Sequence, residues 1–510
     1  MPLALLKFHA FLDEKNPVNR IPRIEGERLP RSNRRDLLWI LAGTVLLATI
    51  LRLIFFEGLW GSDDFAHVHF ATSWDHKPAN HHEARLFYNA LLRLAILAFG
   101  RNELAYAIPS LLASAILVAS SIWCAGCLGG RRAMLIAGLI AATMPVDVIY
   151  ATVPAAGSLS AGLAAVGTML LLIKSRPYAM IIACLILALS ILAHMIAIFY
   201  VGALICGLLF AARTWQERKQ AVVCGFAVFL LFAIFELTLF TAIAGDPFYE
   251  FRTIKQTHLQ NIYLHSSSTY SLWWFIWPIK AWLFSKDFGL TLCIVSVLAL
   301  LSWRHLSPPL KAITVTLIVF WLWLGYGTQK PTGYLPFHRV ARFGHMLTMP
   351  VAVLLGSLLA RRGVIGVFST MAIGGMGILL VASSGSWGQK VEITREFLPY
   401  IRAHPHTLFL AGASAQYQLF ILNQCEEIPN VAVWDEIPAD GDRPVAILLN
   451  PLNSEQPPER LKFGTALHVT QPTYRSIATL LPEALVQTHP WFVRRPPGQI
   501  VQLAKEESVR

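Results

Sequence analysis

The stretch LLWILAGTVLLATILRLIFFEGLWGSDDFA (residues 37–66) joins a long apolar run to two adjacent carboxylates. A helix needs about 20 apolar residues to cross the hydrocarbon core of a bilayer, and the run 37–56 meets that length. Residues 1–36 are polar and basic, whereas a signal peptide begins with a short charged region and an apolar core. We therefore expect a retained membrane helix that ends close to an acidic surface at Asp63 and Asp64.

Composition extends the membrane assignment to most of the chain. Of its 510 residues, 55% are apolar and 14% are charged, and the mean hydropathy is +0.53. Soluble proteins carry about 25% charged residues. The formal net charge of +12 gathers as Lys and Arg in short loops between apolar runs, as orientation charge does in membrane proteins. The sequence therefore predicts a membrane protein without a nucleic-acid partner.

Apolar runs recur throughout residues 37–383 and predict a polytopic α-helical membrane protein with about eleven transmembrane helices. The predicted helices cover roughly 37–56, 103–126, 133–151, 155–173, 178–193, 195–212, 221–244, 289–305, 312–327, 343–360 and 364–383.

Loop charges predict the orientation of these helices. The tight turns near Val153 and His194 carry no basic residue. Basic loops mark the cytoplasmic side of a membrane, so we expect residues 1–36 to be cytoplasmic in a multi-pass protein of the cell membrane. The loops that alternate with those turns are basic, through Arg131 and Arg132, Lys174 and Arg176, Arg213, Arg218 and Lys219, Arg304 and Lys311, and Arg361 and Arg362.

The same map leaves four segments outside the cytoplasm, namely 57–102, 245–288, 328–342 and 384–510. The last is polar and Pro-rich, and it predicts a small extracytoplasmic α/β domain. Its expected elements are strands at Thr407–Leu410, Val431–Trp434 and Val445–Leu449 and a helix at Ala413–Asn423. In the second segment, Leu272–Phe284 is too short to span and predicts an interfacial helix, which could also guide a lipid substrate.

The segment 57–102 is dense in ionisable residues. One of its two adjacent aspartates can accept a proton as a general base, and together they can hold a divalent cation. The alternative is a solvated loop in which the aspartates cap the following helix. The ionisable residues are Asp63, Asp64, His67, His69, Asp75, His76, Lys77, His81, His82, Glu83 and Arg85.

Metal and redox sites receive little support from the sequence. Cys124 and Cys127 form a CxxC pair, but no second pair or nearby His completes a zinc site. The histidines of the first outer segment lack the i, i+4 spacing of helical zinc sites. The sequence predicts no certain cofactor beyond the divalent cation already considered.

A series of short motifs resembles the GT-C glycosyltransferases, especially the branch of the protein O-mannosyltransferases and the lipid A aminoarabinose transferases. That family places an acidic pair just after the first membrane helix, and the later motifs follow in the same order and topological position. The corresponding residues are Asp63–Ala66, Lys77 and Pro78 or Arg85–Tyr88, Phe99 and Gly100, Pro109 and Ser110, Gly130–Arg132, Pro145, Arg342 and Phe343, and Pro350.

The resemblance implies roles for particular residues. Asp63 would be the catalytic base, and Asp64 would support it or help to bind a cation. Asp147 would stand in for an acidic residue that the family carries early in its fourth helix. The remaining residues implied for substrate or lipid-phosphate contact are Glu83, Arg85, Lys77, Arg339, Arg342 and Lys330. For Arg339, Arg342 and Lys330, the alternative is that they anchor the chain at lipid headgroups.

Two further ionisable residues fall inside predicted helices, where charge is costly. Arg52 lies near the outer end of the first helix and could face a donor phosphate or extend outward to the interface. Glu236 lies in the seventh helix, and a buried carboxylate there predicts a functional or paired group whose partner the sequence does not reveal.

The resemblance implies a glycosyltransferase that moves a sugar from a polyprenyl-phosphate donor to a lipid, glycan or protein acceptor at the outer face of the membrane, with inversion. The alternative function is a transporter or flippase of a lipid-linked or anionic substrate, although we detect no internal repeat of the kind that transporters carry. A non-catalytic assembly subunit is a third interpretation, and it predicts that Asp63 is dispensable.

Overall fold

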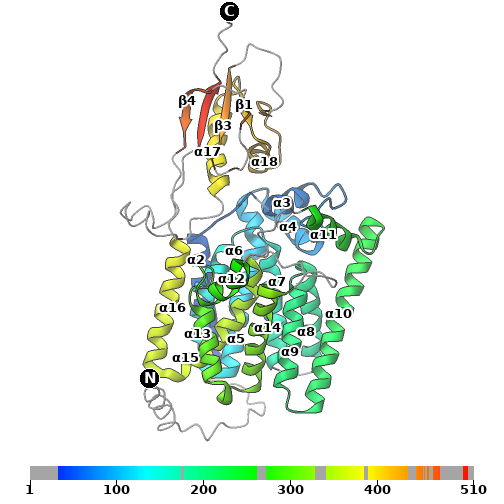
Figure 1. Cartoon of the computed structure of the whole chain (residues 1–510), viewed down its shortest axis with the longest axis vertical. Coiled ribbons are helices and arrows are strands. Elements are labelled where there is room, and N and C mark those ends of the chain that lie inside the picture. The colour runs from blue at the N-terminus through cyan, green and yellow to red at the C-terminus, as the bar shows by residue number, and fades with distance from the viewer. Residues whose placement is uncertain are drawn as a thin grey trace, which may run out of the picture. The chain divides into compact units, whose positions relative to one another are not determined.

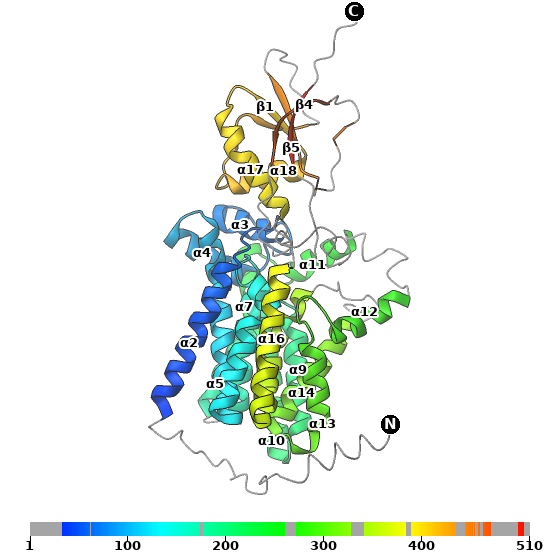
Figure 2. The ribbon, with the colours of Figure 1, turned by 90° about the vertical axis from the view of Figure 1, so that its left-hand side faces the viewer.

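The computed structural model describes residues 33–61, 63–173, 177–260, 272–327, 341–383, 389–434, 444–451, 453, 457–458, 463–470 and 498–503. Helices dominate residues 33–383, and long helices run alongside one another in two perpendicular views (Figures 1 and 2). The α-helices are α2 (Asn33–Ile54), α3 (Asp63–Ser73), α4 (Leu86–Phe99), α5 (Glu103–Thr143), α6 (Pro145–Tyr150), α7 (Ala156–Ile173), α8 (Pro177–Ala193), α9 (Ala197–Ala211), α10 (Trp215–Ala244), α11 (Tyr249–Gln260), α12 (Leu272–Leu283), α13 (Thr291–Leu301), α14 (Pro308–Tyr326), α15 (Thr348–Leu359), α16 (Gly363–Ser383), α17 (Gln389–Ala403) and α18 (Ala413–Leu422). The 3-10 helices are η3 (Trp303–His305), η4 (Ala341–Leu347) and η5 (Ala360–Arg362).

The polytopic helical fold predicted from the apolar runs is confirmed. In the described part of the chain, five helical segments are long and apolar enough to cross a membrane: Glu103–Thr143, Ala156–Ile173, Trp215–Ala244, Pro308–Tyr326 and Phe343–Ala382. Shorter apolar helices cover Leu38–Ile54, Leu86–Phe99, Tyr178–Ala193, Ala197–Ala211 and Thr291–Leu301. Each of the predicted ranges falls on helical residues, while the number that cross the membrane stays a prediction.

Two glycines divide the longest helical segments at predicted basic turns. Gly130 interrupts α5 with a φ of 79°, and Gly363 follows η5 with a φ of 55°. Only glycine adopts this backbone region without strain. The pairs Arg131–Arg132 and Arg361–Arg362 lie directly beside these glycines, so each apolar segment turns where its positive charges are.

Small residues allow the helices to pack closely. A Cβ atom on Gly207 of α9 would lie 2.3 Å from the carbonyl oxygen of Ala312 in α14. A Cβ atom on Gly356 of α15 would lie 2.6 Å from the carbonyl oxygen of Ala133 in α5. Close backbone approach at small residues is the usual packing mode of membrane helices, so these contacts agree with the membrane assignment.

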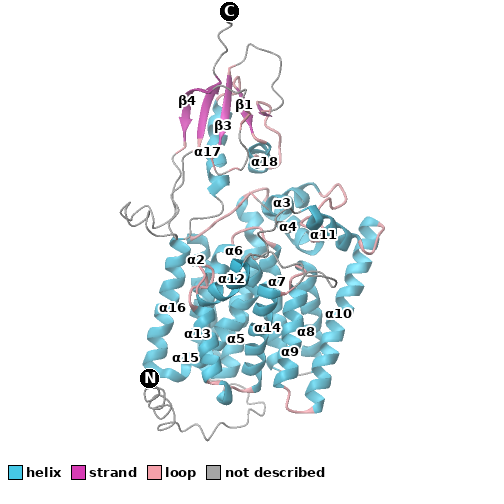
Figure 3. Ribbon diagram, viewed as in Figure 1, coloured by secondary structure: helices cyan, strands magenta, loops and turns pink. Residues whose placement is uncertain are grey.

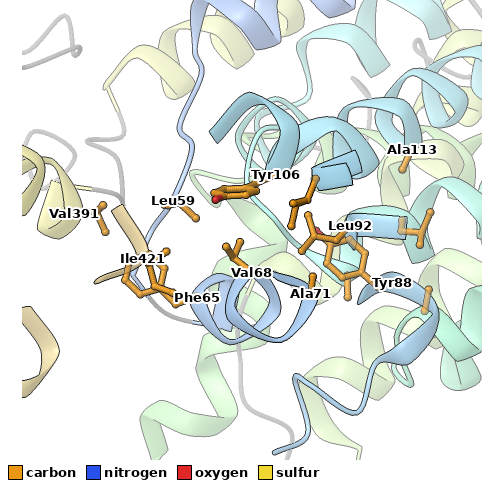
Figure 4. Packing of buried hydrophobic residues seen from close by; sticks show 14 residues of the cluster. Leu59, Phe65, Val68, Ala71, Tyr88, Leu92, Tyr106, Ala113, Val391 and Ile421 are labelled. Carbon is orange, nitrogen blue, oxygen red and sulfur yellow. The ribbon is translucent and has the colours of Figure 1, made fainter. Parts of the chain in front are cut away.

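The first outer segment contains two helices, α3 and α4, whereas the sequence offered a helix after the aspartates only as part of an alternative interpretation. Phe65 and Val68 of α3 pack against Tyr88 and Leu92 of α4 in one buried cluster (Figure 4). The helical character of residues 63–73 is hidden in the sequence because polar residues interrupt the apolar pattern.

The C-terminal residues form a five-stranded mixed sheet, drawn in magenta in Figure 3. Its order is β2-β1-β3-β5-β4, with β1 parallel to β2 and β3, and β5 antiparallel to β3 and β4. The predicted strands and the helix α18 are present, while the last two strands were not predicted. The strands are β1 (Leu408–Ala411), β2 (Val431–Val433), β3 (Val445–Leu449), β4 (Phe463–Val469) and β5 (Gln499–Leu503).

Apolar and charged contacts join the C-terminal part to the first outer segment. Val391 and Ile421 belong to the same buried cluster as Phe65 (Figure 4). An ion pair links Arg395 of α17 to Glu103 at the start of α5. These contacts hold the C-terminal part against the helix that begins with the acidic pair.

Candidate functional site

A pocket opens beside the N-terminal end of α3, with an empty volume of about 570 Å³ that includes space open to solvent. The outer segment and the ends of several helices supply its lining. The lining residues are Trp60, Asp63, Asp64, His67, Arg85, Tyr150, Val153, Pro154, Ala155, Ala156, Gly157, Ser158, His194, Ile196, Phe343, His345 and Met346. The pocket therefore unites Asp63, Asp64 and Arg85 from the set of predicted site residues.

The two adjacent aspartates have different surroundings. Asp64 is buried, and its Oδ2 accepts hydrogen bonds from the backbone N–H of Trp60 at 2.6 Å and of Gly61 at 3.2 Å. The side chain of Asp63 is 23% exposed, and its Oδ1 lies 3.4 Å from Nε2 of His82. Asp64 thus holds the turn before α3, while Asp63 keeps a carboxylate that can meet a ligand.

Two histidines with lowered pKa values, His67 and His82, lie on this side of the pocket. Nδ1 of His67 lies 2.8 Å from Oδ1 of Asn89, and the imidazole packs edge-on against Tyr88 at 4.9 Å between ring centroids. Burial lowers the pKa of His67 to about 3, with a further contribution from Arg85. Burial also lowers the pKa of His82. Arg85 therefore supplies fixed positive charge here, and His67 does not.

The deepest part of the site is a buried charge network. Arg52 of α2, which is 1% exposed, forms an ion pair with Asp147 of α6, which is fully buried. Ser114 of α5 donates a hydrogen bond to Oδ2 of Asp147 at 2.8 Å. Nε2 of His345 in η4 lies 2.6 Å from Oδ1 of the same carboxylate. Arg52 therefore faces inward, and Asp147 lies directly behind the pocket residue His345.

Two predicted contact residues lie outside the pocket lining. Nζ of Lys77 donates to the carbonyl oxygen of Ala244 at 3.2 Å and is otherwise exposed. Glu83 is buried and accepts hydrogen bonds from the backbone N–H of Ala79 at 2.6 Å and from Nδ2 of Asn80 at 2.8 Å. Glu83 therefore organises the turn between α3 and α4, and Lys77 links that turn to the end of α10.

The predicted residues of the third outer segment are only partly described. Lys330 and Arg339 lie outside the described residues, and Arg342 lies in η4, where its side chain is not described. Their neighbour Phe343 lines the pocket and packs edge-on against His194 at 5.7 Å between ring centroids. The segment that carries Arg342 therefore reaches the pocket through its next residue.

Glu236 has the partner that the sequence did not reveal. It is buried in α10 and shares a hydrogen bond with Glu250 of α11. Burial and the neighbouring Glu236 carboxyl raise the pKa of Glu250 well above its usual value.

Among the residues that the structure describes, no group of three or more His, Cys, Asp or Glu is arranged to hold a metal ion.

Sequence analysis missed four aromatic side chains of the pocket, namely Trp60, Tyr150, His194 and His345. Tyr150 and His194 follow apolar runs and resemble ordinary ends of membrane helices. His345 lies two residues after Phe343, within the motif that resembles a family signature. A buried histidine beside that motif was the available signal, but its partner Asp147 lies 198 positions away in the chain.

The helical bundle and the C-terminal sheet together have the GT-C fold. The structure is similar to the crystal structure of ArnT from Cupriavidus metallidurans in the apo state. The two have 13% sequence identity and a TM-score of 0.51, over 92% of this chain and 98% of that chain. No family model and no curated protein sequence matches the chain.

Two further solved structures align less closely. ArnT from Cupriavidus metallidurans bound to undecaprenyl phosphate has 13% identity and a TM-score of 0.46, over 93% of this chain and 99% of that chain. The oligosaccharyltransferase AglB from Archaeoglobus fulgidus, in complex with an inhibitory peptide and a dolichol-phosphate, has 11% identity and a TM-score of 0.49, over 78% of this chain and 64% of that chain.

The buried ion pair makes a prediction about stability. Arg52→Met leaves the Asp147 carboxylate buried without its cation, which should cost about 3–5 kcal/mol of unfolding free energy. Adding Asp147→Asn removes the unpaired charge and should recover most of that loss. Denaturant unfolding of the purified protein in detergent measures both changes. Equal losses in Arg52→Met and in the double variant would contradict this explanation, because the loss would then not come from the unpaired Asp147 carboxylate.

Proposed function

We propose that the chain is a glycosyltransferase that transfers a sugar from a polyprenyl-phosphate donor to a lipid, glycan or protein acceptor, with inversion at the anomeric carbon. The observation that supports this proposal is the pocket that brings Asp63 together with Arg85 and His345. A general base and cationic groups in one cavity are the parts that this chemistry requires. The GT-C fold agrees with the proposal.

Asp63 is the proposed general base. Its carboxylate is partly exposed and lines the pocket, whereas Asp64 already accepts two backbone hydrogen bonds. In the proposed reaction, Asp63 takes the proton of an acceptor hydroxyl or amine, and the acceptor atom attacks the anomeric carbon. The bond from that carbon to the phosphate oxygen breaks, and its electron pair leaves with the polyprenyl phosphate.

The departing phosphate needs positive charge, because negative charge develops on its oxygen as the bond breaks. Arg85 lines the same pocket and is the proposed partner of the phosphate. A guanidinium group binds phosphate oxygens through paired N–H donors. Arg342, Arg339 and Lys330 remain proposed contacts to the lipid phosphate, and a divalent cation at Asp63 remains a further proposal.

We also propose that the pocket faces away from the cytoplasm. The basic turns beside Gly130 and Gly363 support this orientation, since positive loops mark the cytoplasmic side. The C-terminal part contacts α3 and would therefore lie outside the cytoplasm with the pocket.

A single cysteine at position 75 tests this orientation in a variant that lacks the seven native cysteines. The Asp75 side chain is 72% exposed, so Asp75→Cys should react with a membrane-impermeant maleimide added outside intact cells. Arg132→Cys, next to the turn at Gly130, should react only after the membrane is opened. The opposite labelling pattern would contradict the proposed orientation.

The catalytic proposal predicts a large loss of transfer in Asp63→Asn. Removal of a general base typically costs about 100-fold or more in rate, and the amide is nearly the same size as the carboxylate. Transfer from a labelled polyprenyl-phosphate sugar to candidate acceptors, in a membrane preparation, measures the effect.

Asp75→Asn is the matched control for that assay, because Asp75 follows α3 closely but is exposed and paired with His76. It should transfer at close to the wild-type rate. Wild-type activity in Asp63→Asn would exclude Asp63 as the base, and accumulation of unreacted donor on the opposite side of sealed vesicles would instead indicate a flippase.

A further inference from the structure

His345 is the pocket histidine whose orientation the structure fixes most completely. It lies in η4, is 2% exposed and lines the pocket. Nε2 lies 2.6 Å from Oδ1 of Asp147, and the ring lies 6.3 Å from that of Tyr150 between centroids. Because Nε2 is directed at a carboxylate, it carries a proton, and Nδ1 is the ring nitrogen left to meet a ligand.

The partner of His345 is itself fixed. Asp147 accepts hydrogen bonds from Ser114 and pairs with Arg52. The backbone beside His345 is also confined, because a Cβ atom on Gly344 would lie 3.0 Å from the ring of Phe288. These contacts limit both the displacement and the rotation of the imidazole.

The buried charges behind His345 neutralise each other, so they do not repel an anion in the pocket. On the buried side, Asp147 and Arg52 offset each other. His194 faces the pocket from the start of α9 and accepts a hydrogen bond from the backbone N–H of Ile196 through Nδ1 at 3.2 Å. Asp147 therefore occupies the Nε2 side of His345, and the Nδ1 side is left to meet a ligand in the pocket.

The first outer segment supplies four further ionisable side chains to the pocket lining. Asp63, Asp64, His67 and Arg85 face the same pocket. Asp64 is occupied by backbone donors, and His67 is bonded to Asn89. Arg85 and His345 both line the pocket, and they come from segments far apart in the chain.

We propose that His345 is a phosphate-binding residue of the donor site, with Asp147 as the positioning residue that turns its Nδ1–H toward the phosphate. This inference rests on the proposed function, because it takes the pocket as the donor site. Phe343 and Met346 give this part of the pocket apolar walls, and an apolar surrounding strengthens a charge-assisted hydrogen bond to a phosphate oxygen. The arrangement holds the phosphate from η4 while Arg85 holds it from the turn before α4.

Binding of polyprenyl phosphate tests this inference without any transfer step. The probe is the fluorescently labelled lipid phosphate, titrated against the purified full-length protein in detergent, with no acceptor present. His345→Ala should weaken binding by about tenfold or more, as expected for the loss of a hydrogen bond to a charged group. His305→Gln, at an exposed histidine of η3, is the matched control and should bind like the wild type.

Two conservative variants report which ring nitrogen meets the phosphate. The amide nitrogen of Asn occupies roughly the position of Nδ1, and that of Gln occupies roughly the position of Nε2. His345→Asn should therefore recover more binding than His345→Gln. Thermal unfolding without the lipid should show that each variant is folded before its affinity is compared.

The outcomes separate this inference from the proposed function. A wild-type protein that does not bind the lipid phosphate would overturn both. Tight binding by the wild type and equal binding by His345→Ala would overturn the role of His345 and leave the donor proposal standing. Better recovery of binding by His345→Gln than by His345→Asn would overturn the proposed orientation of the His345 ring, in which Asp147 holds Nε2 and Nδ1 meets the phosphate.

Discussion

The ion pair between Arg52 and Asp147 is the interaction on which the site depends. Both side chains are almost completely buried, where an isolated charge would be very costly. Arg52 uses four hydrogen bonds, to Ser114, to Asp147 and to the carbonyl oxygens of Ala48 and Ala142. One guanidinium group thereby ties α2 to α5 and α6, and the carboxylate that it neutralises holds His345 of η4.

The two adjacent carboxylates beside the pocket, Asp63 and Asp64, have different roles. Asp64 fixes the turn at residues 60–61 through backbone hydrogen bonds, so that α3 begins at a defined position. Asp63 is then presented to the pocket with its carboxylate partly exposed. Adjacent residues on a helix point about 100° apart, which explains how one becomes structural while the next can meet a substrate.

The sequence predicted the membrane fold well because apolar runs and loop charges are local signals. The acidic pair, its place after the first helix and the early strands of the C-terminal sheet were also predictable. A helix after the aspartates was only an alternative interpretation of the sequence, because the polar residues of α3 break the helical pattern. The residues that stabilise α3, such as Tyr88, Leu92 and Ile421, come from elsewhere in the chain. Strands β4 and β5 were missed because their pairing joins residues far apart in the sequence.

The site was predicted only in part, for a related reason. Asp63, Asp64 and Arg85 lie in one short segment, so their proximity could be inferred from the sequence. The contact of Asp147 with Arg52 and His345 joins three segments separated by many residues, and no local pattern predicts it. Lys77 and Glu83 share the acidic segment with Asp63, but Lys77 donates to the carbonyl oxygen of Ala244 in α10 and Glu83 bonds to the backbone of the turn before α4.

We propose that one pocket, between Asp63 and the Asp147–His345 pair, holds the phosphate of the donor. A cryo-electron microscopy structure of the protein with bound polyprenyl phosphate would locate that phosphate. We expect phosphate density within hydrogen-bond distance, about 3 Å, of both Arg85 and His345, with the Asp63 carboxylate across the pocket. Phosphate density outside this pocket, with Asp63 remote from it, would overturn the proposed donor site.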